Sequence, residues 1–497
     1  MAIYYISPNG NDNNLGTISS PFKTLVKAWR VIAPGDTVYL RGGVYSFSQM
    51  QYLQGKNGSA GNLIKIWAYP GEIPVLKRGY TYDANNIDLV YLEGNYFHWK
   101  GIEFADNKQE INGTGWSSFR AGFTNNSIFE TINYHHNGAG FSIRGNSSNN
   151  LILNSDFHHN QDPFSAEPFD GADGLALNFV TGTGNVVRGC RFYWNADDGV
   201  DLWSNEGHVL IENCWSFYNG YIPDTFNIAG NGCGFKLGTT TAAPNTVKRN
   251  IRNCISYKNR NWGFCENQAL VNMTLYNNIG ADNGTLNYWF GSWGASPKTF
   301  RNNISLNGGS LWGNVGYLLG DDAIHDHNSW NGLGASNADF VSVDPAQLLL
   351  PRKADGSLPD ITFLVPKSPK FINSGINVGL PFNGSAPDLG AFETGGTIIP
   401  TTSTTTSTTK APITTSTTTS TTIKPTTSTT TSTTLAPSLK TIRTANNNLS
   451  TKRLTITFTD GTTKTVSNST KPIKTVSTDY VTNRVTVTYT DGTTSIL

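Results

Sequence analysis

The 497-residue sequence has few charged residues, and the two signs nearly cancel. Charged residues make up 14% of the chain, whereas about 25% is typical of globular domains. The balance of 36 basic and 35 acidic residues does not imply a polycationic surface, which argues against nucleic-acid binding. Asn, Ser, Thr, Gly and aromatic residues take the place of charge. This composition favours a β-rich protein whose surface suits neutral or sugar-like ligands.

Long apolar runs are also missing, and so is a secretory signal. The chain has no stretch of about 18 apolar residues, the length that crosses a bilayer as a helix, so we expect no membrane span. The opening MAIYYISPNGNDNN has neither the basic nor the apolar segment of a signal peptide. We expect an extracellular or virion-associated protein that either lost a signal or leaves the cell another way, for example inside a virus particle.

Cysteine is scarce, with five residues in the chain. Their spacing does not resemble a zinc site, and an odd number does not indicate a disulfide framework. We interpret all five as buried thiols that pack like small apolar side chains. They are Cys190, Cys214, Cys233, Cys254 and Cys265.

The composition divides the chain into three parts. Residues 1–396 are even in composition, and we predict that they form one large domain. Residues 397–438 carry three copies of TTSTTTSTT. Such a tract buries too little apolar surface to offset the entropy of ordering, so it predicts a disordered linker. Residues 439–497 are rich in Thr and predict a small β module.

The C-terminal module contains an internal repeat. LTITFTDGTTKTV (454–466) recurs as VTVTYTDGTTSIL (485–497), and both copies alternate around Asp-Gly. This pattern predicts two β-hairpins. The module has no catalytic constellation, so we expect it to bind a virion or cell-surface partner or to support assembly.

The large domain repeats short segments at irregular intervals. The cysteines Cys190, Cys214 and Cys254 fall in one column of the alignment. Short strands with such columns predict an all-β parallel β-helix. A β-sandwich with chance similarity is the alternative. A helical spacing from Lys23 to Ile32 predicts a cap on the open N-terminal end, and PDLGAFE (387–393) resembles a last strand. A second column consists of Asn160, Asn195, Asn219, Asn259 and Asn278.

A second set of strands carries the candidate chemistry. The segments align on Gly140, Gly174, Gly199, Gly234 and Gly263. The next position is apolar in each copy and should face the core: Phe141, Leu175, Val200, Phe235 and Phe264. By strand alternation, the position after it should face outward. That outward column reads Ser142, Ala176, Asp201, Lys236 and Cys265.

Four carboxylates should gather beside this column. Asp173 and Asp198 each precede an aligned glycine, and Asp197 precedes Asp198. Asp201 joins them if the chain bends at Gly199, which glycine permits. Four oxygen donors of this kind suit Ca²⁺. The alternative is that these acids are ordinary turn caps.

The GADG, ADDGVDLW and GFKLG series inside a predicted β-helix resembles the family 9 polysaccharide lyases, whose known members include pectate lyases. The resemblance covers about residues 1–395 and implies a right-handed β-helix. It implies that Asp173, Asp197, Asp198 and Asp201 bind Ca²⁺ and that Lys236 is the general base. It leaves the polymer open and does not extend to the tract or the tail.

We therefore expect a Ca²⁺-dependent lyase that cleaves an acidic, uronic-acid-containing polysaccharide by β-elimination, a candidate phage depolymerase. Trp203 follows the outward column closely and is a candidate for stacking on a sugar. Two alternatives stay open: a glycoside hydrolase that uses the aspartates as acid and base, and a non-catalytic glycan-binding virion protein or adhesin. The pairs His135-His136 and His158-His159 could form another metal site, but we interpret them as solvated polar residues.

Overall fold

The computed structural model describes residues 1–80, 88–109, 117–238, 248–292 and 296–395 in full, and the backbone of six strands between residues 442 and 496. The chain divides into two compact units, Met1–Thr402 and Ser403–Leu497. Within the described ranges, no helix combines the length and apolar character needed to cross a membrane. The predicted linker, residues 397–438, lies outside the described residues, so the boundaries predicted from composition stay a proposal.

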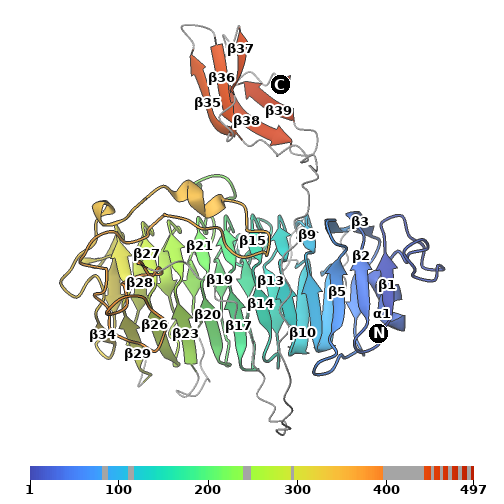
Figure 1. Ribbon diagram of the computed structural model, residues 1–497, viewed down its shortest axis with the longest axis horizontal. Coiled ribbons are helices and arrows are strands. Elements are labelled where there is room, and N and C mark those ends of the chain that lie inside the picture. The colour runs from blue at the N-terminus through green and yellow to red at the C-terminus, as the bar shows by residue number, and fades with distance from the viewer. Residues whose placement is uncertain are drawn as a thin grey trace, which may run out of the picture. The chain divides into compact units, whose positions relative to one another are not determined.

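The first unit is a parallel β-helix built from three sheets, with its coils stacked side by side (Figure 1). Sheet I contains β1 (Ile3–Ile6), β2 (Thr37–Leu40), β5 (Ile64–Ala68), β8 (Phe97–Lys100), β11 (Ile128–Glu130), β14 (Leu151–Leu153), β17 (Asn185–Arg188), β20 (Val209–Glu212), β23 (Lys248–Arg252), β26 (Asn272–Tyr276), β29 (Lys298–Arg301) and β34 (Ile324–Asp326). Sheet II contains β4 (Gln51–Leu53), β7 (Val90–Asn95), β10 (Phe119–Asn125), β13 (Phe141–Arg144), β16 (Leu175–Ala176), β19 (Val200–Asp201), β22 (Phe235–Lys236), β25 (Trp262–Cys265), β28 (Leu286–Phe290) and β33 (Tyr317–Leu319). Sheet III contains β3 (Gly43–Phe47), β6 (Pro74–Arg78), β9 (Glu103–Ala105), β12 (Asn133–His135), β15 (Asp156–His158), β18 (Arg191–Tyr193), β21 (Trp215–Phe217), β24 (Ile255–Tyr257), β27 (Ile279–Ala281) and β30 (Ile304–Leu306).

From β2 to β33, each circuit of the chain adds one strand to each sheet, in the order I, III, II, and β1 and β34 extend sheet I alone. For example, β14, β15 and β16 follow one another in sequence and lie in different sheets. Each pairs in parallel with the strand of the same sheet one circuit later. Neighbouring circuits are therefore about 4.8 Å apart, the spacing between strands of a sheet.

Stacked apolar side chains fill the interior of the helix. The five residues of the predicted inward column of sheet II are fully buried. Phe235 and Phe264 stack with ring centroids 5.1 Å apart, and Phe119 stacks on Phe141 at 4.6 Å. Each large side chain buried in this way contributes roughly 1.5–3 kcal/mol to stability. The prediction of an inward apolar column is confirmed.

The asparagine column forms a hydrogen-bonded ladder between sheets III and II. The side-chain oxygen of Asn219 accepts from the backbone N–H of Asn195 at 3.1 Å, and that of Asn259 accepts from Asn219 at 3.0 Å. The ladder continues at Asn283. Asn278 instead accepts from the backbone N–H of Cys254. The predicted place of Asn278 in this column is wrong, because it extends the cysteine column at the turn between sheets I and III.

The cysteines divide into two groups. Cys190, Cys214 and Cys254 are buried free thiols, as predicted. Cys233 and Cys265 form a disulfide, so the interpretation of all five as thiols is wrong. The two lie on successive circuits with their Cα atoms 6.7 Å apart, which is within the reach of a disulfide.

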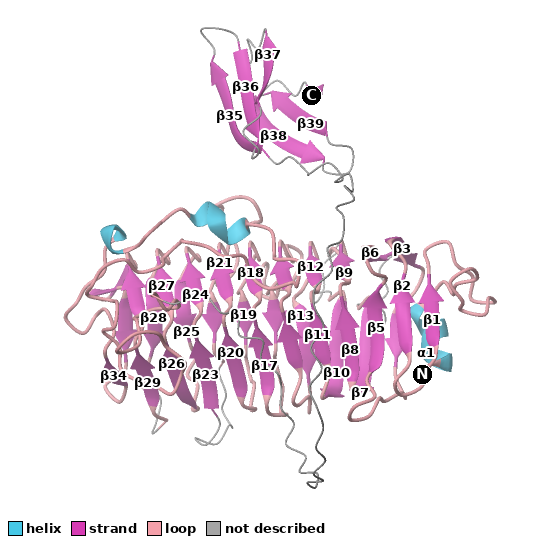
Figure 2. Ribbon diagram, in the orientation of Figure 1, coloured by secondary structure: helices cyan, strands magenta, loops and turns pink. Residues whose placement is uncertain are grey.

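A short helix covers the N-terminal end of the coil stack (Figure 2). Helix α1 (Leu25–Val31) begins after Thr24, whose side chain accepts a hydrogen bond from the backbone N–H of Lys27. Leu25, Ala28 and Trp29 are its buried residues. The predicted helical cap is confirmed, although the helix is shorter at both ends than the predicted span.

Residues 340–395, here called the strap, return along the outside of the β-helix after the hairpin β31 (Ser310–Leu311) and β32 (Asn314–Val315) and the 3₁₀-helix η1 (Asn337–Asp339). The strap contains the 3₁₀-helix η2 (Pro345–Leu349). Residues 387–393 form no strand, so that prediction is wrong. Leu389 is nevertheless fully buried and packs in an apolar cluster with residues of sheet III.

The second unit contains two three-stranded antiparallel sheets. The predicted hairpins correspond to the pairs β36–β37 and β39–β40, and each pair carries one further strand. One sheet consists of β35 (Ile442–Asn448), β36 (Arg453–Phe458) and β37 (Thr463–Ser467). The other consists of β38 (Ile473–Asp479), β39 (Arg484–Tyr489) and β40 (Thr494–Ile496).

Candidate active site

The outward column of sheet II has the register that the sequence predicts. Ala176 pairs with Asp201, Asp201 with Lys236, and Lys236 with Cys265. These four residues therefore occupy one position on successive strands. Lys236 lies one circuit from Asp201, a separation of about 4.8 Å between strands.

Three of the predicted acids form a tight group. Asp173, Asp197 and Asp198 are buried, and each offers a carboxylate oxygen within 4.8 Å of the others. Backbone groups orient them, since Asp198 accepts from the N–H of Cys233 at 2.6 Å and Asp197 from that of Asn231 at 2.6 Å. The N–H of Asp198 in turn donates to Asp173 at 3.3 Å.

Lys236 connects the fourth acid to this group. Its Nζ lies 2.9 Å from Oδ2 of Asp198 and 3.6 Å from Oδ2 of Asp201. The contact with Asp198 is an ion pair without hydrogen-bond geometry. Oδ2 of Asp198 is buried and accepts no hydrogen bond. The chain bends at Gly199 before β19 begins. Asp198 and Asp201 thus both reach the same ammonium, as the predicted bend requires.

Burial and the charges of neighbouring groups shift the pKa values of the aspartates and of Lys236. Burial raises the pKa of Asp173 and Asp197 well above the usual value, and the neighbouring aspartates raise it further. Burial also raises the pKa of Asp201 to about 6, despite the opposing charge of Lys236. Burial lowers the pKa of Lys236, but the four carboxylates outweigh it and raise that pKa above its usual range.

The aspartate group fits a hard metal ion. Buried carboxylates are stable as anions only beside a compensating positive charge. Asp173, Asp197 and Asp198 supply closely spaced oxygen donors, and one oxygen of Asp198 lacks a hydrogen bond. These three residues could hold a metal ion. In the described part of the chain, they are the one set of three or more candidate ligands spaced closely enough to share an ion.

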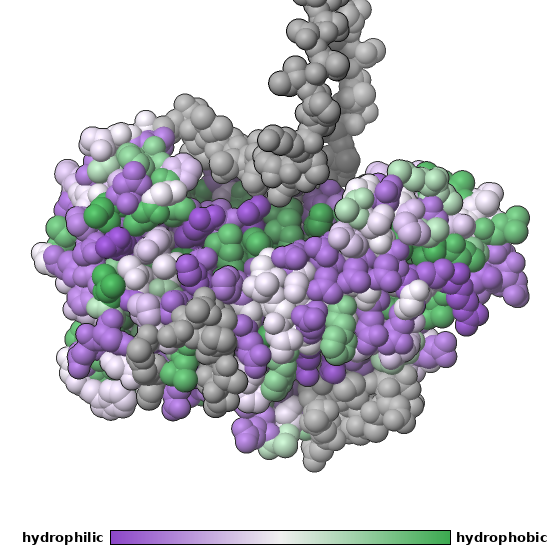
Figure 3. Space-filling view, turned by 90° about the horizontal axis from the view of Figure 1, so that it is seen from below, coloured by the Kyte–Doolittle hydropathy of each residue, from purple (hydrophilic) through white to green (hydrophobic). Residues whose placement is uncertain are grey.

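The site opens into a groove of about 670 Å³. Asp173, Asp201 and Lys236 line it, together with Trp203. Trp203 is 43% exposed, and its ring packs edge-on against that of Phe179 with the ring centroids 4.8 Å apart. Trp203 is therefore available to a ligand, as the sequence suggests. Hydrophilic and hydrophobic residues are interspersed on the molecular face that Figure 3 shows.

Two arginines that the sequence does not single out also line the groove. They are Arg120 of β10 and Arg144 of β13. Arg120 pairs in register with Ser142, so it extends the outward column by one circuit. Arg144 follows Ser142 by two residues on the same strand. The alternation of inward and outward positions is the signal that could have found both arginines, because every second residue of a strand faces the same side. It has to be followed to the end of GAGFSIR for Arg144 and to the preceding strand for Arg120.

The four histidines of the two sequential pairs stack in a ladder. They are not the solvated polar residues that the sequence suggests. His135 and His158 end β12 and β15, and their rings stack at 4.9 Å. His136 stacks on His159 at 5.2 Å. Within each sequential pair, the two Nδ1 atoms are 2.7 Å apart and share a hydrogen bond.

The comparisons with known proteins agree with this architecture. Residues 4–303 match the family described as "Pel9A-like, right handed beta helix region". Pectate lyase L of Dickeya chrysanthemi is 34% identical over 409 residues, which cover 79% of this chain and 90% of the relative.

Two solved structures are similar along most of their length. The crystal structure of pectate lyase Pel9A has a TM-score of 0.66 and 31% identity, over 79% of this chain and 96% of that one. A rhamnogalacturonan lyase has a TM-score of 0.66 and 30% identity, over 74% of this chain and 97% of that one. The match to the family over residues 4–303 also indicates that the β-helix is right-handed. The chain belongs to the Pel9A-like right-handed β-helix family of polysaccharide lyases.

Proposed function

We propose that this lyase cleaves a pectate-like, uronic-acid-containing polysaccharide by β-elimination and depends on Ca²⁺. Asp173, Asp197, Asp198 and Asp201 would hold the ion, and Lys236 is the base. The observation that carries the proposal is the position of Lys236, which lines the groove and whose Nζ lies 2.9 Å from Oδ2 of Asp198. An amine and a hard-cation site are thereby within reach of one sugar.

The reaction needs a base at C5 of a uronate and a way to stabilise the charge that develops. When bound, Ca²⁺ would draw electron density from the uronate carboxylate, which makes the C5 proton more acidic, and would offset the negative charge that keeps Lys236 protonated. Lys236 in its neutral form removes the C5 proton. The electron pair forms the C4–C5 double bond as the C4–O bond breaks, which leaves an unsaturated sugar on one product. The departing oxygen keeps the electrons of the broken bond, takes a proton from water and becomes a hydroxyl group on the other product. Trp203 is proposed to stack against a sugar ring beside the reacting one.

The relatives support the substrate class. Those named above are two pectate lyases and a rhamnogalacturonan lyase. Because the backbones of both named polymers contain uronic acid, we propose an acidic backbone as the substrate. The disulfide Cys233–Cys265 supports an extracellular place of action, where disulfides persist. The comparisons lend no support to a phage particle.

The test is cleavage of pectate followed by ultraviolet absorbance of the unsaturated product. We expect activity that a chelator removes and added Ca²⁺ restores. We expect Lys236→Ala to lower kcat by about 10²–10⁴-fold, the usual contribution of a positioned base. Lys108→Ala is the matched control, because that side chain is 58% exposed and does not line the groove.

Other outcomes would replace the proposal. Chain shortening without ultraviolet absorbance would indicate a glycoside hydrolase, and polymer binding without any shortening would indicate a binding protein. Full activity of Lys236→Ala on a cleaved polymer would remove this lysine from the mechanism.

A further inference from the structure

The groove continues beyond the aspartates toward the N-terminal end of the β-helix. Arg120, Ser142, Ala176 and Asp201 occupy one outward column on four successive strands of sheet II. Arg120 and Arg144 are half-buried and line the groove. The groove therefore has a second charged region, of opposite sign to the aspartate group and on the same face of the same sheet.

The two arginines differ in how the protein neutralises them. Nε of Arg120 lies 3.1 Å from Oδ2 of Asp88, whose side chain is 5% exposed. Nε of Arg144 donates to Oγ of Ser142 at 3.0 Å, and its guanidinium lies 5.7 Å from the centroid of the Phe179 ring. Among the described residues, Arg144 has no ion-pair partner. Burial lowers the pKa of Arg144 and the nearby charge of Arg120 lowers it further, whereas the carboxylates of Asp88 and Asp173 oppose the shift without outweighing it.

Arg144 is thus a half-buried cation whose terminal amino groups have no acceptor in the described part of the protein. A guanidinium can bind a carboxylate through two parallel N–H···O bonds, and such charge-assisted pairs are stronger than neutral hydrogen bonds. A ligand carboxylate would therefore complete this site. Phosphate would fit the same fork, but the proposed substrate carries carboxylates.

A polyuronate carries one carboxylate on every sugar. A chain whose reacting sugar lies at the aspartates and that runs along the outward column carries further carboxylates past the preceding circuits. We propose that Arg144, assisted by Arg120, binds the carboxylate of a second uronate and so selects unesterified acidic polymers. This inference deepens the proposed function and depends on it for the identity of the substrate. Arg144 is a substrate-binding residue in this proposal and takes no part in proton transfer.

The kinetic test compares Arg144→Met with the parent enzyme on pectate. Methionine keeps an unbranched side chain over Phe179 but removes the charge and all five donors. We expect KM to rise about tenfold or more, as loss of a charged hydrogen bond implies, while kcat changes less than about threefold. Arg144→Lys should recover only part of the loss, because it restores charge without the planar fork. A thermal melt of each variant checks that it is folded.

A binding test separates this proposal from the catalytic one. Calorimetry would measure the affinity of two proteins, Lys236→Ala and the double variant Lys236→Ala, Arg144→Met. The ligands are a galacturonate hexamer and its methyl ester. We expect the hexamer to bind about tenfold more weakly once Arg144 is replaced, and the ester to bind weakly in both proteins. Equal hexamer affinities, or no binding of the hexamer to either protein, would overturn the role of Arg144. Failure of the parent enzyme to cleave pectate, with Arg144-dependent binding intact, would overturn the lyase proposal alone.

Discussion

Gly199 occupies a position that leaves no room for a side chain. A Cβ there would overlap Oγ of Ser216 and lie 2.6 Å from the carbonyl oxygen of Gly234. Gly174 faces the same limit, with the carbonyl oxygen of Gly199 2.6 Å from its would-be Cβ. The aligned glycines are thus required because successive circuits approach closely beside the asparagine ladder. The bend next to the aspartates depends on this close approach.

We predict that Gly199→Ala destabilises the β-helix by about 1–3 kcal/mol, the usual effect of overpacking a filled site. The added methyl group must push Ser216 or the neighbouring circuit away. That displacement would also move Asp198, which precedes Gly199. Urea denaturation measures the stability, and Ca²⁺ binding measured by calorimetry reports the second effect.

The double variant Gly199→Ala, Ser216→Ala is the matched control. It removes the hydroxyl that the new methyl group would overlap, whereas the contact with Gly234 remains. We expect part of the lost stability to return relative to Ser216→Ala alone. A Gly199→Ala protein as stable as the parent would show that the circuits can separate easily.

Residue alternation explains which site residues the sequence predicts. Asp201 and Lys236 share a column because strand alternation and coil register fix both positions. The same rule puts Cys265 next to Lys236, but it gives no distance to Cys233 in the preceding turn. The disulfide depends on how that turn approaches the next circuit, which a column alignment does not contain. Arg144 was missed because the alignment ended at the outward column.

At the scale of the element, the turn between sheets III and II is a stack of buried amides. The oxygen of Asn219 accepts from both the backbone N–H and the side-chain amide of Asn195, at 3.1 and 2.9 Å. Its own amide donates to the carbonyl oxygen of Phe192 and to Oδ1 of Asn259. Each buried asparagine thereby satisfies polar groups on the circuits before and after it.

Asn219→Ala should reduce stability by about 2–4 kcal/mol. The change leaves the buried N–H of Asn195 and the carbonyl oxygen of Phe192 without this partner, and each such loss costs about 1–3 kcal/mol. Denaturant unfolding followed by circular dichroism provides the measurement.

Asn146→Ala is the comparison for that experiment, because Asn146 is exposed. Substitutions at such surface positions usually change stability by less than about 0.5 kcal/mol. If the two variants were equally stable, the ladder would contribute nothing beyond an ordinary surface asparagine.

The ladder also shows why an alignment can assign a residue to the wrong turn. The turns between sheets I and III and between sheets III and II both place a residue of positive φ before the ladder position. Asn277 (φ 54°) precedes Asn278 in the first kind, and Lys258 (φ 48°) precedes Asn259 in the second. The two turns therefore select similar dipeptides. Sequence spacing predicts the β-helix correctly, but it does not distinguish these two turns. The column alignment therefore places Asn278 with Asn259 although the two residues lie in different turns.

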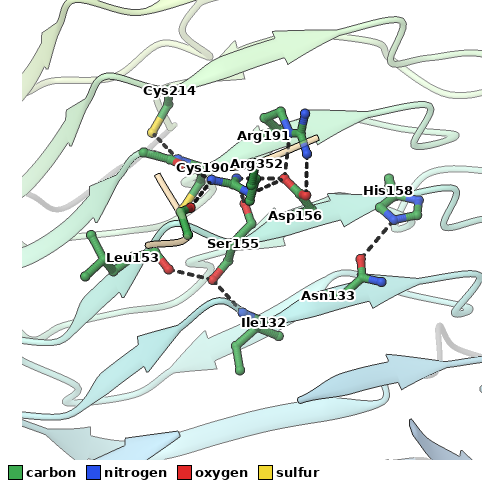
Figure 4. A network of polar contacts seen from close by, with 12 residues as sticks. Ile132, Asn133, Leu153, Ser155, Asp156, His158, Cys190, Arg191, Cys214 and Arg352 are labelled. Atoms are coloured by element: carbon green, nitrogen blue, oxygen red, sulfur yellow. Dashed lines mark hydrogen bonds and ion pairs between the residues drawn. The ribbon is translucent and has the colours of Figure 1, made fainter. Parts of the chain in front are cut away.

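At the scale of the first unit, the strap is tied to the β-helix by one buried ion-pair network (Figure 4). Asp156 of β15 contacts Arg191 and Arg352 at 2.7 Å each, across 196 positions of sequence in the case of Arg352. Arg191 also donates to the carbonyl oxygens of Leu348 and Leu350 in the strap. The Asp156 side chain is 16% exposed, so water screens the network little.

We predict that Asp156→Asn destabilises the unit by about 3–5 kcal/mol at pH 7, because it leaves two arginines without the negative charge that they share. Burial alone would raise the pKa of Asp156, but Arg191 and Arg352 outweigh it and hold the pKa well below its usual value. Asp360→Asn is the control, since Asp360 is 64% exposed in its pair with Lys353, and exposed pairs contribute at most about 1 kcal/mol.

The sign of the pH dependence follows from that lowered pKa. The unfolded chain binds a proton at Asp156 near pH 4, about the value of a free aspartate, whereas the folded chain binds it only at lower pH. The stabilisation is therefore complete above about pH 4 and is lost as the pH falls toward the folded pKa. Denaturation of the parent protein and of Asp156→Asn at pH 7 and pH 3 should show a difference that shrinks in acid. A difference that stayed constant between the two pH values would mean that the carboxylate charge does not anchor the strap.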